Sequence, residues 1–229
     1  MKELVELLKG ETAVLYGQPM VGKTLSTIVL GKFLKQETKK PAYYIWSDAN
    51  LLGKYGEFLK KTSGGVVEYA KNPRDLDIAL RKLRHRIEAA GECPYSMVVV
   101  DSITGFQETI MAREGIDSPR TALLLGRLSQ LIARELRILS VTYDIPSIMI
   151  AHQTAIFNPK STALGPFAGK DRKPTIVTKA LRNVTLLIYM FIDPDKDKPA
   201  WLIEDIRTSA DKVEKFPKGT IFHLDIKVR

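Results

Sequence analysis

Short apolar runs alternate along this chain with longer segments in which apolar and polar residues are mixed. The apolar runs lie at residues 12–16, 43–46, 97–100, 147–150 and 184–192. Uninterrupted apolar runs of this length are typical of strands buried on both faces, and the mixed segments between them have helical spacing. This alternation predicts βαβ units, and therefore an α/β fold with a mostly parallel central sheet flanked by helices.

The last third of the chain has a different pattern. Residues 201–206 and 221–228 have the composition of strands, and charged turns that contain proline and glycine connect them. Turns of this kind join antiparallel neighbours, so the pattern predicts an antiparallel C-terminal extension of the sheet. A length of 229 residues suits one α/β domain, and we expect residues 1–229 to form a single unit.

The sequence contains start and stop signals for two helices. One is expected to begin at Asn72, with Pro73 in the first turn, and to end near Gly91. The other is expected to begin after Asp117-Ser118-Pro119 and to run to about Ser140. The apolar spacing predicts that the second helix buries Leu124, Leu128 and Leu131.

Composition and charge narrow the class of protein. The chain has 35 Lys and Arg residues against 26 Asp and Glu residues, a net charge of +9, which is compatible with a polyanionic partner. One cysteine, Cys93, excludes an internal disulfide framework and a cysteine-rich zinc site. No apolar run is long enough to span a bilayer, so we expect a cytoplasmic protein without a membrane partner.

A glycine-rich segment follows the first predicted strand and precedes a helical pattern. It reads GQPMVGKT from Gly17 to Thr24, the G-x-x-x-x-G-K-T pattern of phosphate-binding loops. In such a loop Lys23 would reach the β- and γ-phosphates from near the surface of the crevice, and Thr24 would bind Mg²⁺. We therefore expect ATP and Mg²⁺ as ligands, with a glycine-rich turn as the alternative. The expected nucleotide-binding residues are Gly17, Gln18, Pro19, Met20, Val21, Gly22, Lys23, Thr24 and Leu25.

A carboxylate ends another predicted strand. Asp101 follows the apolar run at residues 97–100. In a parallel sheet the carboxyl ends of the strands open onto the ligand crevice, so Asp101 would lie beside Thr24 and hold Mg²⁺ through a water molecule. An aspartate at a strand end is common, and the metal interpretation depends on its pairing with the glycine-rich loop.

Two further strand ends carry polar residues. Asp48 follows the run at residues 43–46 and could align a water molecule for attack on the γ-phosphate, or it could cap the segment after it. Gln153 follows the run at residues 147–150 and could bind and sense the γ-phosphate. His152, beside it, is interpreted as a packed or capping side chain. Lys23, Asp48 and Gln153 are the candidate catalytic residues.

The order of these parts resembles the RecA/RadA recombinase family, and within it the RadB-like RadA paralogues of archaea. The resemblance covers nearly the whole chain. It implies a RecA-like P-loop NTPase core, in which the position of Asp48 is usually glutamate, so we expect weak ATP hydrolysis. It rests on GQPMVGKT, YYIWSD, VVVDSITGF, IPSIMIAHQ and WLIEDIRTSADKVEKFPKGTIFHLDI.

The resemblance also implies that segments at about residues 104–118 and 154–178 contact DNA. In the second segment cations, aromatic residues and glycines are interleaved, which suits a mobile loop that binds single-stranded DNA. A solvated surface loop is the alternative. The candidate DNA-binding residues are Lys160, Lys170, Arg172 and Lys173.

Only about ten residues precede the first predicted strand. The resemblance therefore implies that the N-terminal DNA-binding domain and the polymerisation linker of full recombinases are missing, and we do not expect long self-assembled filaments. The segment at residues 205–217 resembles the loop that caps a neighbouring subunit's ATP.

These features favour an ATP-binding, DNA-dependent ATPase that assists homologous recombination and DNA repair. One alternative is a non-catalytic nucleotide-binding regulator that docks on a full-length RadA-type recombinase. Another is a small-molecule P-loop kinase, which the basic segment and the lack of an arginine-rich lid argue against.

Overall fold

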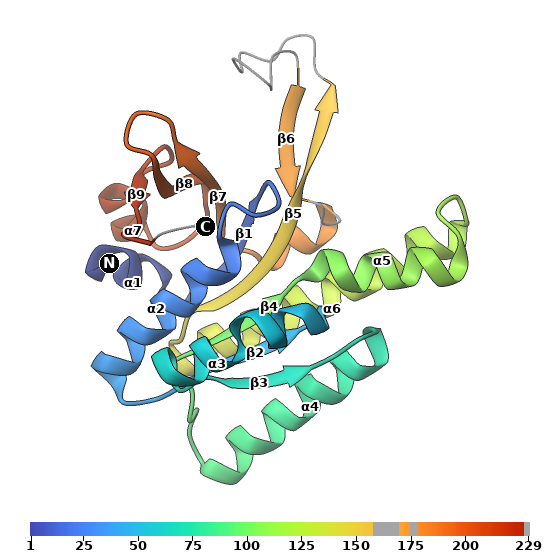
Figure 1. Ribbon diagram of the computed structural model, residues 1–229, viewed down its shortest axis with the longest axis horizontal. Helices are drawn as coiled ribbons and strands as arrows, with labels where there is room; N and C mark the ends of the chain where they lie inside the picture. Colours follow the sequence, from blue (N-terminus) through green and yellow to red (C-terminus); the bar gives the residue numbers. More distant parts are fainter. Residues whose placement is uncertain (158–169, 175–177, 227–229) are drawn as a thin grey trace.

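A computed structural model describes residues 1–157, 170–174 and 178–226. It has an α/β fold built on a mostly parallel, nine-stranded mixed sheet that is flanked by helices (Figure 1). The strand order is β3-β2-β4-β5-β1-β7-β8-β9, and β6 pairs with β5 outside this path. The strands are β1 (Thr12–Gly17), β2 (Ala42–Trp46), β3 (Val66–Tyr69), β4 (Met97–Asp101), β5 (Ser147–Phe157), β6 (Lys170–Pro174), β7 (Leu186–Asp193), β8 (Lys198–Ile206) and β9 (Ile221–His223).

The expected parallel centre is confirmed. Strands β3, β2, β4, β5, β1 and β7 are paired in parallel, and β8 and β9 continue the sheet in antiparallel pairing. The sequence pattern missed β3, because this edge strand is only partly buried and includes Glu68. The predicted strand at residues 221–228 is shorter than expected and ends at His223.

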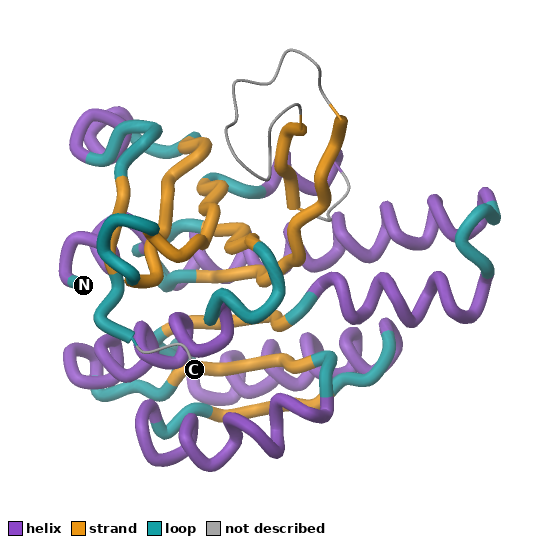
Figure 2. The backbone as a smooth tube through the Cα atoms, turned by 45° about the horizontal axis from the view of Figure 1, so that its top comes forward, coloured by secondary structure: helices purple, strands orange, loops and turns teal. Residues whose placement is uncertain are grey.

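Helices cover both faces of the sheet, which explains the uninterrupted apolar runs (Figure 2). Val98 and Val100 of β4 pack into the core under one set of helices, and Met97 and Val99 pack into the core on the opposite face. Both faces of such a strand are buried, so apolar residues do not have to alternate with polar residues along it. The helices are α1 (Lys2–Leu8), α2 (Lys23–Thr38), α3 (Ala49–Ser63), α4 (Pro73–Ala90), α5 (Ile103–Glu114), α6 (Pro119–Tyr143) and α7 (Ala210–Lys215), and η2 (Thr178–Asn183) is a 3₁₀-helix.

The helix ends follow the capping signals. The side chain of Asn72 accepts hydrogen bonds from the backbone N–H groups of Arg74 and Asp75, and Gly91 ends α4 with a φ of 70°. Helix α6 begins at Pro119, close to the predicted start after this residue, and ends at Tyr143, beyond the expected end. The prediction that it buries Leu131 is wrong, because this side chain lies on the outer side of the helix.

In their described residues, the two segments expected to be DNA-contacting loops contain helix and strand. Most of residues 104–118 forms α5, whose first turn is capped by the Ser102 hydroxyl accepting a hydrogen bond from the Gly105 N–H group. Helices α5 and α6 run side by side and extend past the ends of the sheet's strands (Figures 1 and 2). In the second segment, β5 continues to Phe157 and pairs antiparallel with β6, and these two strands form an arm that projects from the sheet. Within the described ranges, no helix combines the length and the apolar character that a membrane crossing requires.

Candidate functional site

The glycine-rich loop joins the end of β1 to the start of α2. Two glycines are required by its shape: a Cβ atom on Gly17 would lie 2.3 Å from the carbonyl oxygen of Met190, and Gly22 has a φ of 93°. The loop therefore begins against the neighbouring strand β7 and ends in a left-handed residue that starts the helix. This places the first N–H groups of α2 at the loop, where helix N-termini favour anions.

Lys23 folds back onto the loop that precedes it. Its Nζ atom donates hydrogen bonds to the carbonyl oxygens of Gly17 at 3.0 Å and Gln18 at 2.6 Å. The expectation that Lys23 lies near the surface of the crevice is wrong, because the residue is only 6% exposed. Burial lowers the pKa of its ammonium group to about 8, and the nearby Asp101 opposes this shift. Lys23 is therefore a desolvated cation held at the loop by backbone oxygens.

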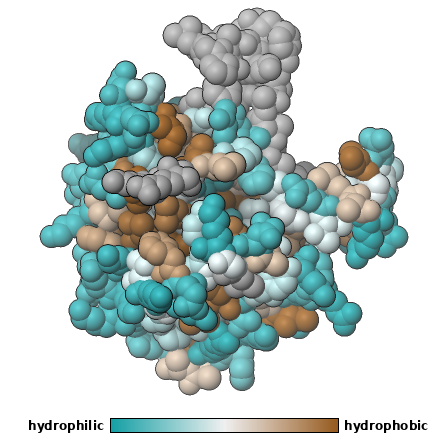
Figure 3. Space-filling model, viewed as in Figure 1, coloured by the Kyte–Doolittle hydropathy of each residue, from teal (hydrophilic) through white to brown (hydrophobic). Residues whose placement is uncertain are grey.

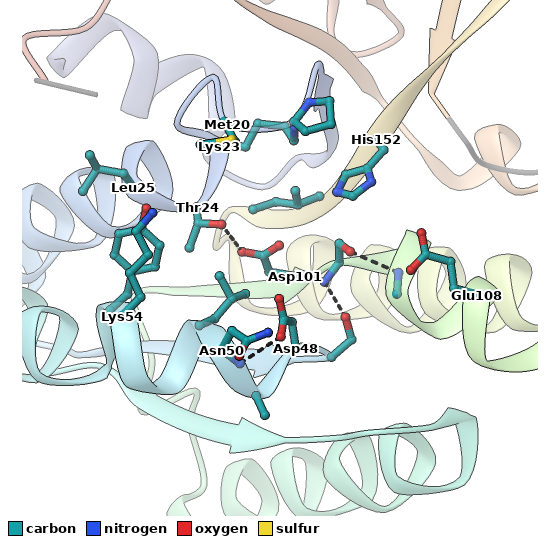
Figure 4. Close-up of a pocket in the computed structure, with 18 of the residues that line it drawn as sticks. Met20, Lys23, Thr24, Leu25, Asp48, Asn50, Lys54, Asp101, Glu108 and His152 are labelled. Atoms are coloured by element: carbon teal, nitrogen blue, oxygen red, sulfur yellow. Dashed lines mark hydrogen bonds between the residues drawn. The ribbon is translucent and has the colours of Figure 1, made fainter. Parts of the chain in front are cut away.

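Thr24 and Asp101 are brought together as the sequence predicted. The Thr24 hydroxyl donates a hydrogen bond to Oδ2 of Asp101 at 2.6 Å (Figure 4). Asp101 is 4% exposed, and burial raises the pKa of its carboxyl group to about 6, against the opposing effects of the Thr24 hydrogen bond and the Lys23 charge. A hydroxyl and a carboxylate are hard oxygen ligands of the type that Mg²⁺ prefers, and this metal takes few protein ligands when phosphate oxygens supply others.

Asp48 has a structural role that the sequence left open. Its carboxylate accepts a hydrogen bond from the N–H group of Asn50 at 2.8 Å and caps the N-terminus of α3. The side chain is exposed, lines the same cavity as Lys23 and Asp101, and contributes to the raised pKa of Asp101. The cap is thus observed, and the water-positioning role stays a prediction.

A set of hydrogen bonds holds the ends of β2 and β4 against α5. The Ser102 N–H group donates to the Ser47 hydroxyl at 3.0 Å, and the Ser47 N–H group donates to the carbonyl oxygen of Asp101 at 2.8 Å. Gly105 lets α5 approach closely, because a Cβ atom there would lie 2.3 Å from the Ser47 hydroxyl oxygen. These contacts fix the position of Asp101 relative to Asp48.

These elements enclose a cavity of about 910 Å³ at the carboxyl ends of the parallel strands. Its walls include side chains of α3 and α5 that the sequence analysis missed, namely Leu51, Lys54 and Tyr55 on α3, and Glu108, Thr109 and Ala112 on α5. Their spacing of three or four residues puts each set on one helix face. The same spacing is visible in the sequence, but it does not tell which face of either helix meets the loop.

Strand β5 brings His152, and not Gln153, to this cavity. His152 lines the cavity, whereas the alternation of side chains along a strand directs Gln153 to the opposite face of the sheet. His152 is the β-sheet neighbour of Gly17, and its N–H group donates a hydrogen bond to the Thr104 hydroxyl at 2.9 Å. Burial lowers the pKa of its imidazole, and Lys23 adds to the shift. The γ-phosphate role of Gln153 therefore stays a prediction that this placement does not favour.

The candidate DNA-binding residues lie away from the cavity. The backbones of Lys170, Arg172 and Lys173 belong to β6, where they pair with Phe157, Ala155 and Thr154 of β5, and the Lys173 side chain is exposed. Lys160 lies outside the described residues. Because β5 runs from the cavity into this arm, one strand connects the two predicted sites.

No protein-family model matches this chain, and no curated protein matches it. A mostly parallel α/β sheet with a glycine loop, a buried lysine and a threonine–aspartate pair at its carboxyl end defines a candidate phosphate-binding site.

Proposed function

We propose that this protein is a RecA-like P-loop NTPase that binds ATP and Mg²⁺ in the cavity at the glycine loop. The observation that carries the proposal is the convergence of Lys23, Thr24 and Asp101 at one point. The ammonium group of Lys23 would contact phosphate oxygens, while Thr24 and Asp101 would hold the metal, which lowers the negative charge of the phosphates. The N-terminus of α2 adds a favourable field for an anion.

We further propose that the protein hydrolyses ATP slowly. Asp48 lines the cavity, and its carboxylate would orient a water molecule near the terminal phosphate. Its carboxylate is also the N-cap of α3, and the hydrogen bond from Asn50 uses part of its capacity as an acceptor. Because the same carboxylate also caps a helix, it is less available as a base. This supports slow ATP hydrolysis.

The proposed macromolecular ligand is single-stranded DNA, bound along the β5–β6 arm. Lys170, Arg172 and Lys173 belong to β6 of this arm, and the chain as a whole has a net charge of +9. Such a surface suits contacts to phosphates. Assistance to homologous recombination and repair, with a full-length RadA-type recombinase as partner, is the role that the resemblance implies.

A non-catalytic regulator is the second candidate. Two observations favour it: Asp48 caps a helix, and Gln153 does not line the cavity. A protein of this type would use ATP to stabilise a conformation and would dock on the main recombinase without turnover.

Two measurements on the full chain test these proposals. Calorimetric titration with Mg·ATP tests the nucleotide site, and the proposal fails if no binding is seen with the wild-type chain. Turnover of ATP with and without single-stranded DNA separates the two candidates: DNA-stimulated hydrolysis supports the ATPase, whereas ATP binding without turnover supports the regulator.

A further inference from the structure

A second cavity lies at the amino ends of the parallel strands, at the opposite end of the sheet from the glycine loop. Its lining includes Ser96, which directly precedes β4, and Pro146, which directly precedes β5. The Val98 N–H group donates a hydrogen bond to the carbonyl oxygen of Pro146 at 3.0 Å, so the sheet holds this lining in place. The volume is about 460 Å³, within the range of roughly 300–1,000 Å³ that is typical of small-molecule sites. We call it the amino-end cavity.

The inner wall of the amino-end cavity is mostly apolar, and its residues are buried. One hydroxyl group interrupts it: Ser96 is only 3% exposed, and its Oγ atom has no hydrogen-bond partner among the described residues. A buried hydroxyl without a partner is unfavourable, and a polar group of a ligand would satisfy it. The wall residues are Leu34, Cys93, Tyr95, Ser96, Ile145 and Pro146.

The rim of the cavity has more carboxylates than free cations. Asp144 pairs with the Nζ atom of Lys9 at 2.9 Å. Glu92 pairs with the Nζ atom of Lys40 at 3.3 Å. Glu37 is exposed and takes part in no ion pair within the part of the chain that the structure describes. Both rim lysines are therefore neutralised, and a ligand at the rim meets an unpaired carboxylate.

Helix C-termini add to the negative potential of this cavity. Thr38 and Tyr143, the last residues of α2 and α6, both line it, and the wall residue Cys93 follows the end of α4. The last carbonyl groups of a helix carry a partial negative charge, which favours a cation. The surface around the end of α2 is largely hydrophilic, so the apolar wall lies beneath a polar rim (Figure 3). Because the whole chain has a net charge of +9, a cation needs a local site of this kind to bind.

We propose that the amino-end cavity binds a small amphipathic organic amine of the amino-alcohol type. The ammonium group of the ligand lies at the rim near Glu37, its aliphatic chain contacts the inner wall, and its hydroxyl group meets Ser96. The apolar wall supplies affinity, while the few polar groups fix the orientation of the ligand and its charge. The cavity is separate from the nucleotide site, so the proposal does not depend on ATP binding.

Three linear probes of equal carbon number test the charge and the hydroxyl group separately. Aminohexanol carries both groups, hexanediol lacks the ammonium, and hexylamine lacks the hydroxyl. Amide chemical shifts of the isotope-labelled full chain report where each probe binds and how tightly. We expect aminohexanol to shift the amides of Thr38, Cys93 and Tyr143, and to bind about fivefold more tightly than hexanediol.

Variants of the cavity provide the matched comparison. The triple variant E37Q/E92Q/D144N should lose the preference for aminohexanol over hexanediol. Ser96→Ala should lose the advantage of aminohexanol over hexylamine while the melting temperature does not fall, because the variant removes a hydroxyl that has no partner. Val5→Trp, which places a large side chain from α1 in the cavity, should abolish the binding of all three probes.

The proposal is overturned if aminohexanol leaves the amides around the cavity unshifted, or if the wild type binds hexanediol as tightly as aminohexanol. An undiminished preference for the amine in the triple variant would also overturn it, as would unchanged probe binding by Val5→Trp. The Mg·ATP affinity of these variants should equal that of the wild type, which separates this test from that of the nucleotide site.

Discussion

The hydroxyl group of Thr24 donates a hydrogen bond of 2.6 Å to the carboxylate of Asp101, although the two residues lie 77 positions apart in the chain. Thr24 is in the first turn of α2, and Asp101 ends β4. Strand β5 lies between β4 and β1, so the contact reaches across one intervening strand. The pair joins the glycine loop to the carboxylate that would share its metal ion.

The Asp101 carboxyl group should make stability depend on pH. Its pKa is about 6 in the fold against 3.8 in its ordinary state, because burial disfavours the charged form. The folded chain then binds more protons than the unfolded chain between these values, so the stability it contributes falls as the pH rises from about 4 to about 6. Asp101→Asn does not titrate. Its free energy of unfolding relative to wild type should rise by roughly 2 kcal/mol between pH 4 and pH 7.

Urea denaturation of both proteins without nucleotide or Mg²⁺ measures this difference. A difference that stays constant with pH would show that Asp101 titrates normally in the fold. The same variant should bind ATP with little dependence on Mg²⁺, because it lacks the carboxylate.

Lys23→Met should lower ATP affinity by about tenfold or more, because it removes a charged donor to phosphate. Methionine is the matched substitution, since Lys23 is buried and alanine would also leave a gap. The pKa of Lys23 is about 8, so in the wild type the ammonium loses its proton, and ATP affinity should fall, as the pH rises through this value. Calorimetric titrations at pH 7 and pH 9.5 test both effects. Equal affinity of the wild type and the variant at pH 7 would contradict the assignment of the loop.

Substitutions at Asp48 can separate its role as a helix cap from its proposed role in positioning water. Asp48→Asn keeps a good N-cap and should leave the melting temperature unchanged, whereas Asp48→Ala loses the hydrogen bond from Asn50 and should cost about 1 kcal/mol of stability. Both variants should lower kcat while ATP affinity stays similar, because a water-positioning carboxylate acts mainly in the transition state. Asp48→Glu, with the longer side chain usual in the resembled family, serves as the control for reach. If all the variants turn over ATP at the wild-type rate, Asp48 is only a cap.

His152 and Gln153 are neighbours that face opposite sides of the sheet, and this predicts unequal effects. His152→Ala should weaken ATP binding or turnover, because the imidazole lines the cavity beside the glycine loop. Gln153→Ala should have the smaller effect on both quantities. Steady-state kinetics of the two variants measures the difference. A larger loss on removing Gln153 would show that β5 turns its other face to the ligand when ATP binds.

If DNA binds along the β5–β6 arm, removing the basic residues of the arm should change the salt dependence of DNA affinity. Replacing Lys170, Arg172 and Lys173 together by alanine should weaken single-stranded DNA binding. The slope of log K against log salt should become shallower by roughly 0.7 for each phosphate that the variant no longer neutralises. Anisotropy titrations at several salt concentrations measure the slope, and Lys23→Met serves as a control with an intact arm. An unchanged slope would place any DNA-binding surface elsewhere.

Much of the fold follows from local rules that the sequence alone contains. Strands β1, β2 and β4 are apolar on both faces and stand out as runs, and α4 is delimited by the cap at Asn72 and the left-handed Gly91. The glycine loop is recognisable because the shape of its backbone requires a glycine at positions 17 and 22. Each of these signals acts within a few residues, so it is readable without knowledge of the rest of the chain.

Other features depend on the position of one element against another. Leu131 matches the apolar pattern of a core residue, but α6 is rotated so that it lies outside, and β3 is recognisable only from its pairing with β2. The choice between His152 and Gln153 is of the same kind. Both follow an apolar strand, and only the register of β5 against β1, with His152 beside Gly17, decides which one faces the cavity. A strand has two faces that alternate residue by residue, and the sequence does not say which face a distant loop will cover.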